Sequence, residues 1–390
     1  MNSVLMRILG SYGLALAMLG CLFVLTVFGT LYQVDNGLYD AKQTFFNSWF
    51  LTTAGGVPIF PGGVLVMLIL AVNLVVGGLL RIRWRARNAG VIVIHIGIVF
   101  MLVSGLVKLT TAEEGHLTLF EGEEADVFMS YHDYEVAIWE LGQDAQVPQW
   151  VIGDDFLADL GPEDARRFTA PDLPFTLVLS SFLENCNVLP VGPAWTPTGP
   201  VVDGFGFYRM ASEKENERNL AGVHAEVVGA DGSSQRGLLW ERQRAPWAVE
   251  VDGRRFAIHF GHETYPMPFG IRLQQFIKED HPGITMARAY KSRVMQVDGD
   301  GETPVLIQMN EPLRAGGLVL FQASYGPDTP GHEGPWFSTF SVVRNPSDKW
   351  PEYSLWVITA GLVWTFGAHL LAFLRKQAKR RAKAAAGETS

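Results

Sequence analysis

The stretch from Arg81 to Leu109, RIRWRARNAGVIVIHIGIVFMLVSGLVKL, decides the fold of this chain. Four arginines in its first seven residues precede about twenty almost purely apolar residues, enough to cross a bilayer as a helix. Short loops rich in arginine stay on the cytoplasmic side, so this helix is predicted to begin there and run outward. A single histidine, His95, interrupts the apolar run. Because an ionisable group inside a membrane is costly, His95 is a candidate functional residue.

The composition predicts a membrane protein with one large water-soluble domain. Of the 390 residues, 48% are hydrophobic, and the mean hydropathy is +0.14. These values are too apolar for an average soluble enzyme and too polar for a protein made only of spans. Apolar stretches predict transmembrane helices over about 10–31, 58–80, 89–109 and 354–374. Aromatic side chains on one side of residues 38–50 predict an interfacial helix, with a simple connecting loop as the alternative.

The distribution of charge predicts the topology. The net charge is −9, but thirteen of the 31 Lys and Arg residues and only three of the 40 Asp and Glu residues lie outside residues 110–352. Those outer segments therefore carry about +10, and the region between them carries about −19. Four spans place both termini, the arginine-rich loop and the basic tail 375–390 in the cytoplasm, and residues 110–353 outside it. The acidic domain lacks the basic face that nucleic acids need, and it would suit a basic protein partner.

Residues 110–353 have the pattern of β-strands. Apolar and polar residues alternate over short segments that turns rich in Gly, Pro and Asp separate. These segments are 134–141, 175–183, 224–229, 255–260, 270–277, 305–310 and 317–325. The proline-rich stretch 187–200 is interpreted as a loop that divides the domain. The predicted fold class is an integral membrane α + β protein, with a three-span region over 1–109, an extracytoplasmic β-rich, sandwich-like domain and a fourth transmembrane helix.

The sequence contains no enzyme motif. It has no HExxH, no phosphate-binding glycine loop and no defensible Ser-His-Asp arrangement. Cys21 and Cys186 lie far apart and form no CxxC pair, so thiol chemistry by this chain itself is not expected. His259 and His262 form an HxxH pair that would point to opposite faces of a strand, which argues against a metal site. The other exterior histidines are His116, close after the third span, and four interpreted as surface-loop residues: His132, His224, His281 and His332.

Two histidines lie within predicted spans and are candidate ligands of a haem iron. His95 lies about six residues, or about 9 Å, from the cytoplasmic end of its span, and His369 about five residues from that end of the last span. The two imidazoles are therefore expected at similar depth, with Trp364 and Phe366 available to line an apolar cleft for a porphyrin. The alternative for each histidine is a neutral residue hydrogen-bonded to a neighbouring helix.

Three stretches resemble the ResB family, also called CcsB, of system II cytochrome c maturation. The first is GTLYQ, GLY and FNSWF within Gly29–Phe50, and the second is HIGIVFMLVSGLV, His95–Val107. The third, Tyr290–Asp328, is similar to the family element that continues from a Lys-Ser strand into N-P-L-x-x-G-x-x-x-YQ-S-Y. In this chain Glu311 stands inside the Asn-Pro-Leu core, and Phe321 stands where tyrosine is usual. Together the three stretches cover the whole architecture.

The resemblance implies a haem-handling and scaffold subunit of a cytochrome c synthetase in a bacterial inner membrane. Members pair with CcsA/ResC-type membrane proteins, and together they move haem b to the outer face for attachment to the CxxCH cysteines of apocytochromes c. The family role of axial haem ligand falls on His95, with the second ligand from the partner or, as the alternative, from His369. The chain lacks the partner's tryptophan-rich WGxxWxWD motif, so it is not expected to be an enzyme by itself.

The expected partners follow from the same resemblance. The exterior domain would contact the CcsA/ResC-type protein, apocytochrome c or thiol-disulfide reductants, and the spans would contact membrane lipid; no nucleic-acid partner is expected. The alternative function is a membrane anchor or assembly subunit that binds no cofactor. A membrane sensor whose β-domain binds a small ligand is a third reading of the same architecture.

Overall fold

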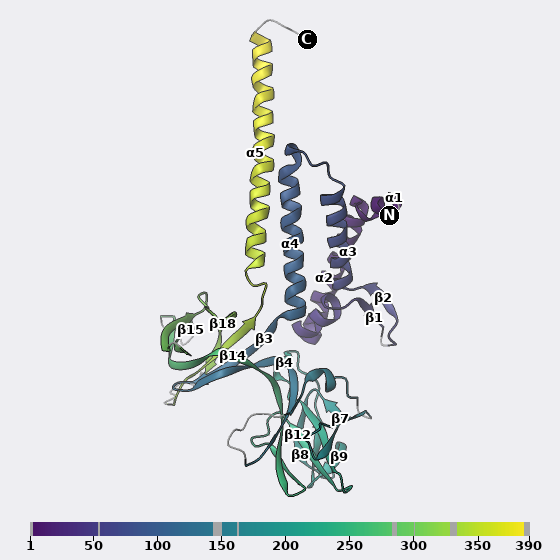
Figure 1. Cartoon of the computed structure of the whole chain (residues 1–390), viewed down its shortest axis with the longest axis vertical. Helices are drawn as coiled ribbons and strands as arrows, with labels where there is room; N and C mark the ends of the chain where they lie inside the picture. Colours follow the sequence, from purple (N-terminus) through teal and green to yellow (C-terminus); the bar gives the residue numbers. More distant parts are fainter. Residues whose placement is uncertain are drawn as a thin grey trace. The chain divides into compact units, whose positions relative to one another are not determined.

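The chain folds into two compact units, each with its own core (Figure 1). The computed structural model describes residues 3–53, 55–142, 150–161, 164–282, 287–299, 301–327 and 334–385. Unit 1 comprises Met1–Ala112 and Asn345–Ser390, and unit 2 comprises Glu113–Arg344. The membrane helices belong to unit 1, and the long strands belong to unit 2.

Unit 1 is helical apart from one short hairpin. Its helices are α1 (Ser3–Leu9), α2 (Tyr12–Ala41), α3 (Gly63–Leu74), α4 (Ala89–Thr111) and α5 (Trp350–Ala385), with a short turn of 3-10 helix, η3 (Ala86–Asn88). α2 and α3 continue into π-helical turns, η1 (Lys42–Phe46) and η2 (Val75–Leu80). Within the described residues, four segments are long and apolar enough to cross a membrane: Tyr12–Phe46, Gly63–Leu80, Ala89–Thr111 and Trp350–Ala382. The predicted set of four membrane helices is confirmed.

The helix boundaries differ from the predicted ones around two glycines. Gly37 breaks α2 with φ 84° and ψ 167°, a backbone conformation that only glycine adopts at little cost, and helical turns then continue to Phe46. The expected interfacial helix over 38–50 corresponds to this short segment, because Phe50 already begins β1 (Phe50–Thr52). β2 (Pro58–Pro61) pairs with β1, so the second membrane helix begins at Gly63. A Cβ on Gly62 would lie 2.2 Å from the carbonyl oxygen of Ser48, so the hairpin requires glycine there.

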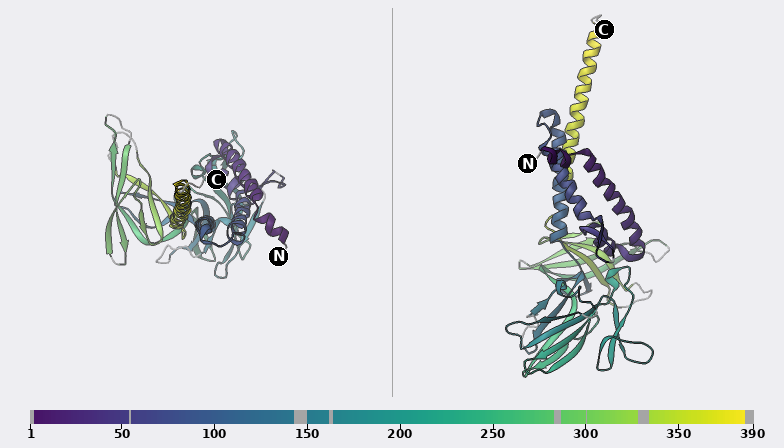
Figure 2. Two further views of the ribbon diagram at one scale, coloured as in Figure 1. Left: turned by 90° about the horizontal axis from the view of Figure 1, so that it is seen from above. Right: turned by 90° about the vertical axis from the view of Figure 1, so that its right-hand side faces the viewer.

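Small residues seven positions apart join α4 to α5 and to the turn just before it, in an antiparallel arrangement. The matched residues are Gly90 with Gly361, Gly97 with Ser354, and Ser104 with Ser347. Ser354 Oγ donates to the carbonyl of Gly97 at 2.7 Å, and Ser347 Oγ donates to that of Ser104 at 2.9 Å. Small side chains allow two membrane helices to approach closely, and hydroxyls add bonds between them. The two helices lie side by side, and α5 continues past the start of α4 (Figure 2).

Unit 2 is made of antiparallel sheets. Its strands are β3 (Glu113–Phe120), β4 (Glu124–Glu140), β5 (Trp150–Ile152), β6 (Ala165–Phe168), β7 (Phe175–Leu183), β8 (Cys186–Pro190), β9 (Thr198–Val202), β10 (Phe205–Arg209), β11 (Gly222–Gly229), β12 (Ser234–Trp240), β13 (Trp247–Val251), β14 (Arg254–Asp280), β15 (Ala287–Asp298), β16 (Gly301–Gln308), β17 (Leu313–Ala315), β18 (Leu318–Gly326) and β19 (Phe337–Arg344). The largest sheet has the order β16-β15-β14-β4-β3-β19-β18-β17, with β13 on β14 and β5 on β4. A second sheet has the order β12-β11-β7-β6, and a third has the order β8-β10-β9.

Two long strands, β4 and β14, run through both halves of unit 2. Residues 256–266 of β14 pair with β4, and after an irregularity between Pro266 and Ile271 the strand pairs with β4 again at residues 271–272 and with β15 from Gly270 onward. The first core lies between the four-stranded sheet and this pair of strands, and it includes the fully buried Phe256. The second core lies where the large sheet curves on itself, around Phe128 and Phe340. Each such side chain contributes roughly 1.5–3 kcal/mol to folding, and the predicted β-rich, sandwich-like domain is confirmed.

The proline-rich stretch 187–200 is not a simple loop. Residues 187–190 belong to β8 and residues 198–200 to β9, which flank β10 in the three-stranded sheet. Both are edge strands, where proline is tolerated because its missing N–H removes no bond from a central ladder. The prediction of a loop therefore holds only for residues 191–197, which contain Pro193 and Pro197, and is wrong for the two ends of the stretch.

Candidate functional site

His95 of α4 has a defined hydrogen-bonding state. Its Nδ1 lies 2.7 Å from the carbonyl oxygen of Val91, one helical turn earlier. A carbonyl oxygen only accepts, so Nδ1 carries the proton and donates it, and Nε2 keeps a free lone pair. This is the arrangement found in metal-bound histidines, whose second ring nitrogen donates to a backbone carbonyl or a carboxylate. The residue therefore meets the chemical requirement for an axial ligand of a haem iron.

The imidazole of His95 lies directly against Gly78 of η2. A Cβ on Gly78 would lie 1.9 Å from Cδ2 of His95, so the ring can occupy this position only because residue 78 has no side chain. Asn73, in the same helix, fixes the neighbouring turn: its Nδ2 donates to the carbonyls of Leu9 at 2.6 Å and Ser11 at 3.0 Å. π-helical turns are common next to functional residues, and η2 brings Gly78 to the face of α4 that carries His95.

The structure separates His369 from His95. The antiparallel register of α4 and α5 places His95 level with Trp356, thirteen residues before His369 along α5. At about 1.5 Å per residue the two imidazoles lie about 20 Å apart along the helix axis. One metal ion holds its two axial nitrogens about 4 Å apart, at about 2 Å each. The expectation of similar depth was therefore wrong, and the two histidines cannot share one iron within this chain.

α5 is also longer than predicted. The last helix was predicted to end at residue 374, but it continues to Ala385 through RKQAKRRAKAA. Lys, Arg, Gln and Ala are among the strongest helix formers, so the basic tail extends the helix beyond its apolar part. His369, Trp364 and Phe366 are exposed, and the indole of Trp364 donates to the carbonyl of Ala86 at 3.4 Å, near the start of α4. These aromatic side chains do not line a cleft at His95.

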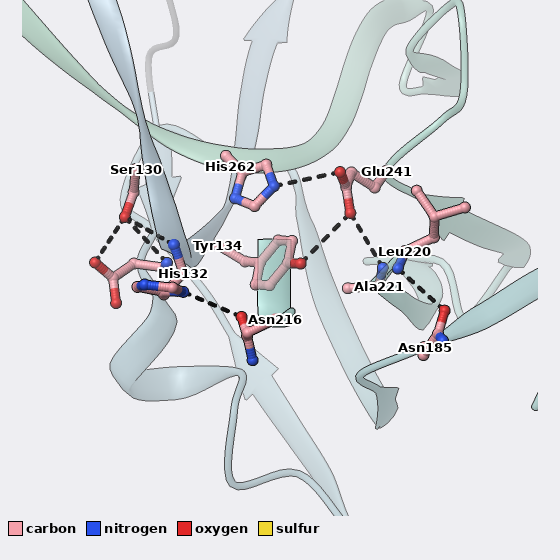
Figure 3. Close-up of polar contacts among 10 residues, drawn as sticks. Ser130, His132, Tyr134, Asn185, Asn216, Leu220, Ala221, Glu241 and His262 are labelled. Carbon is pink, nitrogen blue, oxygen red and sulfur yellow. Dashed lines mark hydrogen bonds and ion pairs between the residues drawn. The ribbon is translucent and has the colours of Figure 1, made fainter. Parts of the chain in front are cut away.

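A second cluster of titratable side chains lies inside unit 2, where β4, β12 and β14 meet (Figure 3). Nε2 of His262, on β14, lies 3.3 Å from Oε1 of Glu241, which follows β12. The other carboxylate oxygen accepts bonds from the hydroxyl of Tyr134 at 3.4 Å and from the backbone N–H of Ala221 at 3.1 Å. The ring of Tyr134 stacks on His262 with 4.6 Å between centroids. Glu241 thus joins the two sheets of the first core.

His116, on β3, completes this cluster from the other side. Its ring meets that of His262 edge-on at 6.2 Å between centroids and stacks on Tyr131 at 5.3 Å. Burial, and next the nearby His262, lower the pKa of His116, which favours its neutral form. Burial and the carboxylate of Glu241 raise the pKa of Tyr134 above its usual range, so its hydroxyl stays protonated. The cluster combines neutral imidazole, a tyrosine donor and a carboxylate.

Sequence reasoning did not predict this cluster. Tyr134, Glu241 and His262 come from three strands or strand ends far apart in the chain, and only the register of β4 against β14 brings them together. His262 was noted as half of an HxxH pair, and the structure places His259 outside the cluster, as expected for side chains three positions apart on a strand. Among the described residues, no group of three or more His, Cys, Asp and Glu side chains is placed to hold a metal ion.

Two histidines predicted to lie in surface loops belong to strands. His224 lies in β11 and is 2% exposed, because the strand begins two residues earlier, at Gly222. His132 lies in β4, and its Nδ1 is 3.1 Å from Oδ1 of Asn216. His281 is exposed and lies outside the strands, as predicted. His332 lies outside the described residues.

Comparison with known proteins gives a family match that lies mainly in the strands of unit 2. A family model described as the ResB-like family matches residues 245–350, from just before β13 to the first residue of α5. This segment includes His262 and the whole of Tyr290–Asp328, one of the three stretches on which the sequence resemblance rests. No curated protein matches the chain.

Proposed function

We propose that this chain, which belongs to the ResB-like family and takes part in cytochrome c biogenesis, holds haem b non-covalently on Nε2 of His95 while the haem passes to the extracytoplasmic face. The observation that carries the proposal is the 2.7 Å bond from Nδ1 of His95 to the carbonyl of Val91. When bound, the haem iron would take the free lone pair of Nε2. Attachment of haem to the CxxCH cysteines of apocytochrome c would be the task of the whole synthetase complex.

The surroundings of His95 support a ligand in preference to a structural histidine. A purely structural histidine would hydrogen-bond to a neighbouring helix. His95 instead uses Nδ1 to bond to its own helix, and this bond does not involve Nε2. The bond to Val91 also fixes the ring plane and raises the basicity of the other nitrogen, as in metal-bound histidines. Gly78 supplies the space in which this orientation is possible.

The second axial ligand comes from another chain in this proposal. His369 is the only other histidine of unit 1, and it lies about 20 Å from His95 along the helix axis. A CcsA/ResC-type membrane protein packed on the α3–α4 side would supply the missing imidazole. One chain then holds half of the site, and haem is bound only by the assembled pair.

The charge distribution supports an orientation for the complex. The arginine-rich loop between η2 and α4 and the basic end of α5 would lie in the cytoplasm of a bacterial cell, and the acidic unit 2 would lie outside its inner membrane. An acidic exterior domain would attract basic apocytochromes c by charge complementarity. In this orientation haem enters near His95, in the cytoplasmic half of the membrane.

The test is the absorption spectrum of the chain purified together with a CcsA/ResC-type partner. We expect bound haem in wild type and in His369→Ala, and little or none in His95→Ala. His369→Ala is the matched control, since it removes the other histidine of unit 1. Haem at the wild-type level in His95→Ala would overturn the ligand assignment. An intact, haem-free wild-type complex would favour an anchor subunit without cofactor.

A further inference from the structure

Among the described residues of unit 2, four buried imidazole nitrogens have no hydrogen-bond partner. Two are on His224, and the other two are Nδ1 of His116 and Nδ1 of His262, both inaccessible to solvent. Nearly all buried polar atoms in proteins are paired, so an orphaned nitrogen indicates a water, an ion or another ligand that completes it. Two such nitrogens occur here in neighbouring rings, with 6.2 Å between the ring centroids.

The carboxylate of Glu241 orients the ring of His262. Nε2 of His262 lies 3.3 Å from Oε1 of Glu241 and can donate to it, and in the neutral ring with its proton on Nε2 the other nitrogen, Nδ1, carries the lone pair. Figure 3 shows the other ring nitrogen directed away from Glu241, toward the part of β4 that carries Ser130. His116 lies on that side, since it pairs with Met129 in the β3–β4 ladder. A carboxylate behind a histidine is the usual support for a histidine that binds metal through its other nitrogen.

Tyrosines of β4 hold both rings in place. Tyr131 stacks on His116 with an interplanar angle of 30°, and Tyr134 stacks on His262 with one of 23°. Stacking restricts rotation of each imidazole about its side-chain bonds, so the side chains lose little conformational entropy when a ligand binds. The two imidazoles are therefore preorganised from the two neighbours of β4 in the sheet, β3 and β14.

The ring separation fits one ion between the two nitrogens. A metal–nitrogen bond of about 2 Å, with about 1.2 Å from nitrogen to ring centre, allows two imidazoles on one ion to lie up to about 6.4 Å apart. The observed 6.2 Å is close to this limit, which corresponds to a wide angle at the metal. A porphyrin cannot reach nitrogens that are closed to solvent, so this pair is not a second haem site.

We propose that His116 and His262 bind one Cu(I) ion through their Nδ1 atoms. Imidazole is a good ligand for copper. Cu(I), with a filled d shell, is stable with only two ligands at a wide angle. No third His, Cys, Asp or Glu side chain joins the pair within the described residues, which disfavours Zn(II) with its four tetrahedral ligands. The ion would tie β3 to β14 across β4, and the site is independent of haem binding at His95.

The experiment titrates the full-length chain in detergent with Cu(I) held by a chromophoric competing chelator. We expect one equivalent to bind wild type and the His259→Gln variant, and at least tenfold weaker uptake by His116→Gln and His262→Gln. His259 is the matched control, because it lies three residues from His262 on the same strand and outside the cluster. No uptake by wild type, or equal loss in the His259→Gln variant, would overturn the proposal.

A measurement on the wild-type chain alone tests the same site without depending on whether the variants fold. X-ray absorption of the Cu(I)-loaded chain should show two nitrogen ligands at about 2 Å and the outer scattering of imidazole rings. Sulfur in the first shell would overturn the proposal, since it would place the ion on Cys186, Cys21 or a methionine.

Discussion

The two units of this chain use histidine in different ways. In unit 1, His95 donates Nδ1 to its own helix and keeps Nε2 free, and no second histidine of the unit lies within reach. In unit 2, His262 uses Nε2 on Glu241 and keeps Nδ1 free, and His116 lies beside it. In our proposals, the first arrangement is half of a metal site that a partner would complete. The second would hold two ligands in one chain, with tyrosines and a carboxylate that orient them.

Gly78→Ala tests the first half of this comparison most strongly. A methyl group at residue 78 would lie 1.9 Å from Cδ2 of His95, so the imidazole must leave its position. We expect haem in the complex with the CcsA/ResC-type partner to fall to roughly a tenth of wild type or less, as for the loss of a group that orients a ligand. Gly105→Ala, on α4, is the control, since nothing lies within 4 Å of its Cβ position. Full haem content in Gly78→Ala would separate haem binding from the observed position of His95.

Glu241→Gln tests the second half. The change keeps the size of the side chain but removes the charge that favours a proton on Nε2 of His262. We expect roughly 10–100-fold weaker binding of Cu(I), the usual effect of losing an outer partner of a metal-bound histidine. Glu226→Gln provides a control in the same domain, because Glu226 pairs with the exposed Arg236 outside the cluster. Equal affinities of the two variants would contradict a supporting role for Glu241.

Gly361→Ala tests the packing that positions α4 against α5. Its new methyl group would lie 2.7 Å from the carbonyl oxygen of Gly90, in the closest part of the helix pair. We expect unfolding in denaturing detergent to become easier by about 1–3 kcal/mol, the usual cost of overpacking. Gly367→Ala, on the same helix with nothing within 4 Å of its Cβ position, should cost nothing. A loss of the same size in both variants would show that the close contact does not stabilise the pair.

The smallest expected effect concerns pH and His224. Burial holds the pKa of His224 below its usual value of 6.5, so the folded chain binds a proton less readily than the unfolded chain. Stability should therefore fall as the pH drops below about 6.5, because the unfolded state then takes up more protons. We expect the midpoint of thermal unfolding to drop less between about pH 7.5 and about pH 5.5 in His224→Leu than in wild type. An unchanged pH dependence, equal to that of the exposed-site variant His281→Leu, would contradict this assignment.

Features that depend on residues close together in the sequence could be predicted, and features that depend on contacts between distant segments could not. The membrane helices follow from runs of apolar residues, and His95 stands out because it interrupts one of them. The alternating strands could be predicted for the same local reason. The depth of His369 could not, because the register of α4 and α5 depends on small residues on two helices more than 240 residues apart. The cluster around Glu241 also depends on strand register, which periodicity does not determine.

The central claim is that the imidazole of His95 ligates haem inside the complex. The most direct measurement replaces it by glycine and adds free imidazole to the purified pair of membrane proteins, following the absorption spectrum. The account predicts that His95→Gly loses the haem spectrum of wild type and regains it when imidazole fills the vacated position, while His369→Gly resembles wild type throughout. A His95→Gly complex that keeps its haem spectrum without added imidazole would contradict it.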